Sequence, residues 1–151
     1  MEKKKVIDAV IKVFMEKINS LNSALEDTRD RARDAPGHNV SHSDTSKFQL
    51  SNLALGIEKQ IMEYKEIADQ LKNLSPRPTI KISVGSLFTL NNIENDKEKI
   101  FIMLYQGGGE KIIIDDIEIT TLSIAAPIAQ ACLNKEIGDE VNNTFEVAEI
   151  Q

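Results

Sequence analysis

Apolar residues recur at alternating steps of three and four through the first half of the 151-residue chain. One stripe of this kind consists of Ile7, Ile11, Phe14, Ile18, Leu21, Leu25 and Thr28, and a second of Leu50, Leu53, Ile57, Gln60, Tyr64, Ile67, Leu71 and Leu74. This spacing is the a and d pattern of a coiled coil. It predicts two helices, each about 30 residues and about 45 Å long at 1.5 Å per residue.

A polar segment, "RDAPGHNVSHSDTSKF", separates the two stripes. Pro36 and Gly37 end the first predicted helix, because proline cannot continue a helix and glycine favours a turn. Ser41, with Asp44 three residues later, has the spacing of a capping box at the start of the second helix. We therefore predict an antiparallel coiled-coil hairpin over residues 1–74, with its tip loop at about residues 34–43.

Shorter apolar runs follow the hairpin. Pro76 and Pro78 end the second helix and predict a linker over residues 75–79. Beyond the linker, β-rich runs lie between turn-like segments: Ile80 to Val84, Leu87 to Leu90, Ile100 to Tyr105, Ile112 to Ile114, Ile117 to Thr120 and Thr144 to Ile150. "APIAQACL" predicts one short helix from about Pro127. The fold class predicted is α+β, a hairpin followed by a small antiparallel sheet domain over residues 80–151.

The formal net charge of −6 is concentrated in the second half of the chain. Residues 1–74 contain 12 Lys and Arg and 12 Asp and Glu, whereas residues 75–151 contain 6 and 12. Tight binding to a nucleic-acid backbone depends on clustered Lys and Arg. The charge distribution therefore argues against direct tight DNA binding and favours a protein partner.

Other features of the composition exclude several classes of site. No apolar run approaches the roughly 20 residues of a membrane-spanning helix, and Asp8 and Lys12 interrupt the one segment that begins like a signal peptide. We expect a cytoplasmic protein. Cys132 is the only cysteine, so no internal disulfide can form, and we expect it in the core. "QGGGE" lacks the spacing of a nucleotide-binding loop and is interpreted as a turn between strands.

The segment "LSIAAPIAQACLNKEIGDEV", with "VGSLFTLNN" before it and "FEVAEI" after it, resembles the C-terminal domain of the Gre-type bacterial transcription elongation factors. The matching positions are Pro127, Ile128, Ala129, Leu133, Lys135, Gly138 and Asp139. Ala126 stands where the family usually has serine, and Asn134 where it usually has glycine. The order of the two halves matches the family as well, so the resemblance covers nearly the whole chain.

The resemblance implies a C-terminal domain with the fold of FK506-binding proteins that docks at the secondary channel of RNA polymerase. The docking residues it implies are Ala126, Pro127 and Ile128. The hairpin would then place its tip near the polymerase active site and stimulate cleavage of backtracked RNA. Any such cleavage would be carried out by the polymerase, so the chain itself is not expected to be an enzyme.

The residues expected at the tip are Asp44, Ser41 and Asp34. Counting back from Phe48, Asp44 and Ser41 occupy the positions of the two acids that the family uses to help hold a catalytic magnesium ion. Carboxylate oxygens are the ligands that this hard ion prefers, and only one of the two matching positions is acidic here. Asp34 is a candidate for the missing charge, and Asp44 is equally explained as a helix-capping acid. We expect no stably bound metal or cofactor, only transient Mg²⁺ shared with the polymerase.

Three alternatives remain open from the sequence. The first is a cleavage-inactive regulator that competes with other channel-binding factors. The second is a peptidyl-prolyl isomerase, although the clustered aromatics of such sites are scarce in a chain with no Trp, two Tyr and five Phe. The third alternative is a coiled-coil chaperone or adaptor. We expect a monomer in each case.

Overall fold

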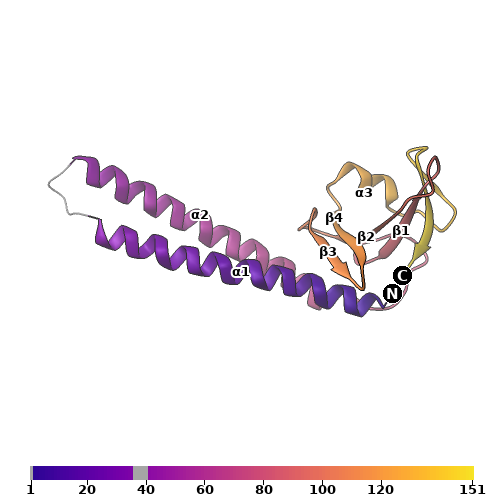
Figure 1. The fold of residues 1–151 in the computed structure, drawn as a ribbon, viewed down its shortest axis with the longest axis horizontal. Helices are drawn as coiled ribbons and strands as arrows, with labels where there is room; N and C mark the ends of the chain where they lie inside the picture. The colour runs from indigo at the N-terminus through magenta and orange to yellow at the C-terminus, as the bar shows by residue number, and fades with distance from the viewer. Residues whose placement is uncertain (1, 36–40) are drawn as a thin grey trace. The chain divides into compact units, whose positions relative to one another are not determined.

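The computed structural model describes residues 2–35 and 41–151, except for the side chains of residues 41–44. Two long helices come first in the chain and a sheet with one short helix follows (Figure 1). The elements are α1 (Lys3–Asp34), α2 (Ser41–Lys72), β1 (Leu87–Asn92), β2 (Glu98–Leu104), β3 (Lys111–Ile114), β4 (Ile117–Ser123), α3 (Pro127–Cys132), β5 (Glu140–Val141) and β6 (Phe145–Ile150). The predicted α+β fold class is confirmed.

Helices α1 and α2, of 32 residues each, form an antiparallel hairpin. Ile18 and Leu25 of α1 pack with Ile61 of α2, and Leu21, Ala54, Ile57 and Tyr64 complete this cluster. Phe14 lies against Tyr64 with ring centroids 5.5 Å apart. The predicted stripe on α1 is confirmed, because its Ile7, Phe14, Ile18, Leu25 and Thr28 are all buried.

The predicted stripe on α2 is wrong at two positions. Leu53 is 52% exposed and Gln60 is exposed, whereas Ile61 and Ala68 are buried. The inward positions are Leu50, Ala54, Ile57, Ile61, Tyr64, Ala68 and Leu71, which alternate steps of four and three, and the predicted Ile67 is buried as well. Leu53 is larger and more apolar than Ala54, so the sequence pattern favours a first step of three residues, whereas Ala54 is the residue that packs in the cluster between the helices.

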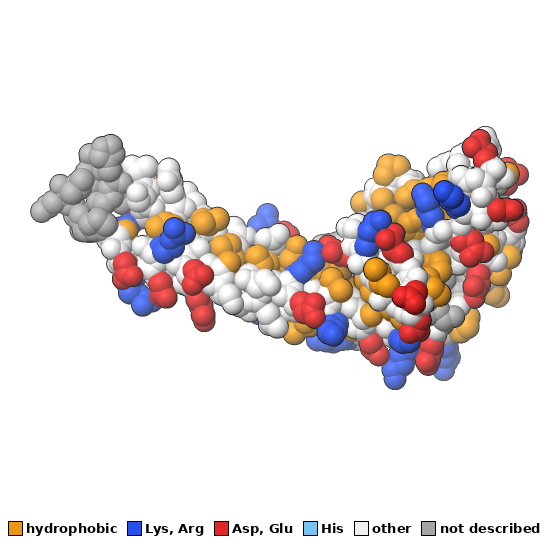
Figure 2. All heavy atoms as spheres, in the orientation of Figure 1, with side chains coloured by type: hydrophobic (Ala, Val, Ile, Leu, Met, Phe, Trp, Pro, Cys, Tyr) orange, Lys and Arg blue, Asp and Glu red, His pale blue; other side chains and the backbone are white. Residues whose placement is uncertain are grey.

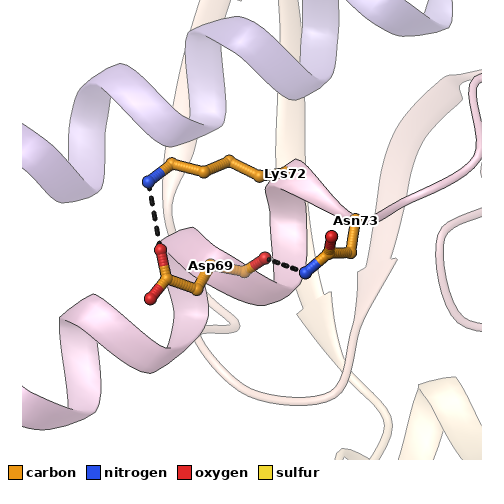
Figure 3. A network of polar contacts seen from close by, with 3 residues as sticks. All are labelled: Asp69, Lys72 and Asn73. Atoms are coloured by element: carbon orange, nitrogen blue, oxygen red, sulfur yellow. Dashed lines mark hydrogen bonds and ion pairs between the residues drawn. The ribbon is translucent and has the colours of Figure 1, made fainter.

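The last turn of α2 is closed by polar contacts around Asp69 (Figure 3). Lys72 Nζ donates to Asp69 Oδ1 at 3.0 Å, and Asn73 Nδ2 donates to the Asp69 carbonyl oxygen at 2.9 Å. Carbonyl groups at the end of a helix lack a partner within the helix, so the Asn73 bond satisfies one of them. These contacts end α2 before the proline-containing segment, where the sequence predicted that it would end.

The six strands form one sheet in the order β3-β4-β2-β1-β6-β5. The expectation of a wholly antiparallel sheet is wrong at one pairing, since β2 and β4 are parallel, with Ile100 opposite Ile119 and Ile102 opposite Thr121. Residues 80–84, predicted as a strand, are not one, although the Ile82 backbone exchanges hydrogen bonds with residues 134 and 135. The two-residue strand β5 was not predicted.

One face of the sheet packs against α3. Phe88 and Leu90 of β1, Met103 of β2 and Val147 of β6 are buried with Ala129 and Cys132 of α3 in one continuous cluster. On the other face, the buried side chains include Ile102, Ile112, Ile114 and Ile119. This core fixes the register of the strands, because a slip of one residue would exchange the two faces.

The chain divides into two compact units. Residues 12–68 form a unit whose described secondary structure is helical, and residues 1–11 and 69–151 form a unit that contains the sheet. Within the residues the structure describes, no helix is both long enough and apolar enough to cross a membrane. The division predicted from the sequence, at residues 75–79, stays a prediction.

Candidate functional site

Two of the three predicted tip residues lie at the ends of the hairpin helices. Asp34 is the last residue of α1 and is exposed, and Ser41 is the first residue of α2. Asp44 belongs to the first turn of α2. The side chains of Ser41 and Asp44 lie outside the described part of the molecule, as do residues 36–40, so the predicted acidic pair and capping box stay predictions.

The hairpin remains packed up to the last turns before the tip. Thr28 is buried, and its hydroxyl donates to the Ala24 carbonyl oxygen at 2.7 Å, which satisfies its polar group within α1. Arg29 of α1 forms an ion pair with Glu58 of α2. The buried contacts of α1 thus extend to Thr28, six residues before Asp34, and the ion pair links Arg29 to the middle of α2.

The described residues contain no cluster of three or more His, Cys, Asp or Glu able to hold a metal ion. Asp34 alone among the tip acids has a described side chain, and one exposed carboxylate is a weak ligand for a divalent ion that prefers several oxygens. Any role of Asp44 and Asp34 toward Mg²⁺ stays a prediction.

The second predicted site surrounds the start of α3. Ala126 has an extended backbone, with φ −70° and ψ 141°, and Pro127 occupies the first turn, where its missing N–H costs nothing. Pro127 is exposed, while Ala126 and Ile128 are half-buried against the core of the sheet unit. The structure therefore brings these three residues together as one partly apolar surface element.

Ser123 has the role of a local cap just before this element. Its hydroxyl accepts from the Ala125 N–H at 3.3 Å and donates to the Tyr105 carbonyl oxygen at 3.2 Å. Gln130 donates from Nε2 to the Ile124 carbonyl oxygen. Side chains on both sides of residues 124–126 thus fix their backbone, although Ala126 itself offers no side-chain cap.

Sequence reasoning did not connect the glycine-rich segment with this element. The segment links β2 to β3, as the turn interpretation predicted. A Cβ atom on Gly108 would lie only 2.6 Å from the Ser123 nitrogen, so only glycine fits there without displacement. Thr121 fixes the loop, because its hydroxyl donates to the Gly107 carbonyl at 2.7 Å and accepts from the Glu110 N–H at 2.9 Å. The adjacent Tyr105 is 56% exposed.

Cys132 is fully buried on the core side of α3, as predicted. Burial raises the pKa of its thiol to about 11, and the nearby Lys135 opposes that shift. A thiol with a raised pKa is a poor nucleophile at neutral pH, because the thiolate is the reactive form. Cys132 is therefore a packing residue.

Comparison with known proteins identifies solved structures only. No family model and no curated protein matches the chain. The chain is similar to the crystal structure of GreA factor homolog 1 (Gfh1) of Thermus thermophilus, with 16% identity, 93% of this chain and 94% of that chain covered, and a TM-score of 0.37. For Gfh1 of Thermus aquaticus, the identity is 16%, the coverage 95% of each chain and the TM-score 0.35.

Proposed function

We propose that this chain is a Gre-type regulator that binds bacterial RNA polymerase and presents the tip of its hairpin in the secondary channel. The observation that carries the proposal is the combination of a packed hairpin with a Pro127-initiated helix on a small sheet, because the sequence of the second half resembles the docking domain of that family. The catalytic step, where it occurs, belongs to the polymerase.

The length of the hairpin supports this role. Two helices of 32 residues, each about 48 Å at 1.5 Å per residue, are long enough for a probe that enters a channel. The inter-helix cluster and the Arg29–Glu58 ion pair hold the probe together along its length. Of the described residues nearest the tip, Arg31, Arg33 and Asp34 are charged and exposed, and Figure 2 shows acidic and basic side chains along this end of the hairpin.

The docking surface proposed comprises Ala126, Pro127 and Ile128, extended by Tyr105 and the glycine-rich loop. Exposed proline and tyrosine side chains add apolar contact area at low entropic cost, because their conformations are restricted. The close approach of Gly108 to Ser123 holds the loop against the start of α3. Docking through this face requires no catalytic residue in the chain.

The residues at the tip favour weak stimulation of RNA cleavage by the polymerase, or none. Ser41 replaces an acid at one matching position, and a hydroxyl is a poorer Mg²⁺ ligand than a carboxylate. Asp44, with Asp34 at the end of α1, would provide the remaining oxygens near a polymerase-bound Mg²⁺. A chain that docks without stimulating cleavage would act by occupying the channel.

The test uses stalled, backtracked elongation complexes of RNA polymerase from the same organism. RNA cleavage is measured with the wild-type chain, with Asp44→Ala and with Asp30→Ala, an exposed acid on α1 that serves as the control. Cleavage lost only in Asp44→Ala identifies a cleavage factor, whereas no cleavage with saturable binding identifies a channel-occupying regulator. Absence of both would refute the proposed function.

Docking is tested separately by the affinity for the polymerase core enzyme. Pro127→Glu places a charge in the proposed surface and is expected to weaken binding by about tenfold or more, which corresponds to about 1.4 kcal/mol. Ile113→Glu is the matched control, because Ile113 is 72% exposed on the edge strand β3. Equal loss in both variants would contradict docking through the start of α3.

A further inference from the structure

A groove of about 280 Å³ lies on the sheet surface across β4, β2, β1 and β6, away from the start of α3. Thr89 of β1 lies between Ile100 of β2 and Glu149 of β6 in the strand register. Glu98 lies two residues before Ile100 and therefore projects from the same face of β2. The groove brings together residues that are up to 64 positions apart in the chain, from Leu87 to Gln151.

The hydroxyl of Thr89 is the first sign that the groove accommodates a ligand. Thr89 is only 7% exposed and lines the groove. Among the described residues, its side chain has no hydrogen-bond partner. The described residues leave one buried side-chain polar atom without a partner, Asn91 Oδ1, so the Thr89 hydroxyl is open to the groove rather than sealed in the core. A group that enters the groove can therefore form a hydrogen bond with this hydroxyl in place of water.

The charge of the groove indicates which kind of chemical group would bind in it. Glu98 and Glu149 both line it, and among the described residues no Lys or Arg does. The one described partner of Glu149 is the neutral amide of Gln151, whose Nε2 donates to Oε1 at 2.7 Å. The neighbouring Lys99 does not neutralise Glu98, since it lies over the Phe145 ring, 5.5 Å from the centroid, on the opposite face of the sheet.

The walls of the groove are apolar. Leu87, Ile100 and Ile117 line it, and Ile117 is 41% exposed. Such walls suit the methylene stem of a long basic side chain, which packs on apolar surface while its charged head meets carboxylates. Guanidinium is preferred over ammonium here, because its five donors in a fixed plane can bond to more than one acceptor at once.

We propose that this groove binds an arginine side chain of a protein partner. The guanidinium donates to the carboxylates of Glu98 and Glu149 and to the Thr89 hydroxyl, and the stem lies on Ile100 and Ile117. The volume suits a single side chain rather than a larger ligand. This contact is distinct from the surface at Pro127 and does not depend on the proposed polymerase function.

The test is an NMR titration of the full chain at physiological salt with the blocked tripeptide acetyl-Gly-Arg-Gly-amide. Backbone amide shifts at Thr89, Glu98 and Glu149 are expected to move together and to saturate. The same peptide with citrulline, which keeps the shape of arginine and loses the charge, is expected to produce no saturable shift. Binding by the citrulline peptide of equal strength would overturn the proposal.

Two pairs of substitutions locate the site. Glu98→Gln with Glu149→Gln is expected to weaken arginine-peptide binding by about fivefold or more. Glu140→Gln with Glu146→Gln removes the same charge from exposed cross-strand neighbours outside the groove and is expected to leave binding unchanged. Equal weakening by both pairs would show attraction by overall charge only and would overturn the proposal.

Thr89→Val tests the hydroxyl without changing the shape of the side chain. Because the Thr89 hydroxyl has no partner in the described structure, the variant is expected to fold with unchanged or higher thermal stability. Its affinity for the arginine peptide is expected to fall by about threefold. Unchanged affinity in a folded Thr89→Val would contradict the assigned hydrogen bond.

Discussion

The two compact units are stabilised in different ways. The sheet unit has a continuous core with ten buried members, covered on one face by α3, whereas the distal cluster of the hairpin has three. Several large apolar side chains of α2 remain exposed, including Phe48 at 68% and Met62 at 69%. The sheet unit is therefore stabilised by one continuous core, whereas the hairpin is stabilised by a narrow stripe of contacts between two helices.

The largest effect is expected in the core of the sheet. Phe88→Ala removes a ring that is 1% exposed and packs on Phe101, with ring centroids 5.8 Å apart. We expect the free energy of unfolding of the sheet unit to fall by about 3–5 kcal/mol. Denaturation followed by NMR signals of each unit provides the measurement. A fall of less than about 1 kcal/mol in the unfolding free energy would contradict a tightly packed core around Phe88.

The buried thiol of Cys132 makes the unfolding free energy depend on pH in the alkaline range. The pKa of the Cys132 thiol is about 11 in the folded chain against 9.0 as its ordinary value, so the stabilisation is full below pH 9 and is lost as the pH rises toward 11. The loss approaches about 2 kcal/mol. Burial lowers the pKa of Lys3, which acts in the opposite direction and is common to all variants.

The measurement for Cys132 is the difference in unfolding free energy between the wild-type chain and Cys132→Ala at a series of pH values from 8 to 11. The difference is expected to narrow as the pH rises, because only the wild type loses the thiol contribution. A constant difference would show that the Cys132 thiol does not titrate differently in the folded and unfolded chain.

Two adjacent residues of α2, one buried and one exposed, test how the hairpin is packed. Ile61 is 5% exposed and Met62 is 69% exposed. We expect Ile61→Ala to lower the unfolding free energy of the helical unit by about 2 kcal/mol and Met62→Ala to change it by less than about 0.5 kcal/mol. Helical circular dichroism during thermal unfolding measures both. Equal effects would contradict the inward register of α2 described above.

The smallest effect is expected at the turn between β3 and β4. Asp115 and Asp116 both have positive φ angles, 51° and 64°, in a two-residue connection that favours Asn-Gly or Asp-Gly. Asp116→Gly should raise the unfolding free energy by about 0.5–1 kcal/mol, and it preserves the ion pair of Asp115 with Lys5. A lower thermal midpoint would show that Asp116 has a favourable contact.

Much of the fold could be predicted because residues close together in the sequence determine its helices, strands and turns. The heptad pattern and Pro36 located both hairpin helices, and the predicted β-rich runs at residues 112–114 and 117–120 lie in β3 and β4. The inward register of α2 was missed because Leu53 and Ala54 compete for one position, and burial by the partner helix decides between them. The parallel pairing of β2 with β4 was missed because alternation reveals which face a residue occupies, but not which strand lies beside it.

The candidate sites were predictable to a smaller extent. Residues 126–128 adjoin one another in the chain, so a motif could identify them. The groove around Thr89 is assembled from four strands, and nothing in the neighbourhood of Thr89, Glu98 or Glu149 in the sequence indicates that they meet. The contact of Gly108 with Ser123 likewise depends on the sheet, although three consecutive glycines are a signal for close backbone approach.

The most direct test of the proposed function measures where the hairpin tip lies in the complex with RNA polymerase. A hydroxyl-radical-generating iron chelate is attached to Asp34→Cys in a Cys132→Ser background, and the cut sites in the polymerase and RNA are mapped. The account predicts cuts beside the polymerase active site and at the 3′ end of the RNA, lost with Pro127→Glu. Cuts restricted to the outer surface of the polymerase, in a complex that is fully bound, would contradict it.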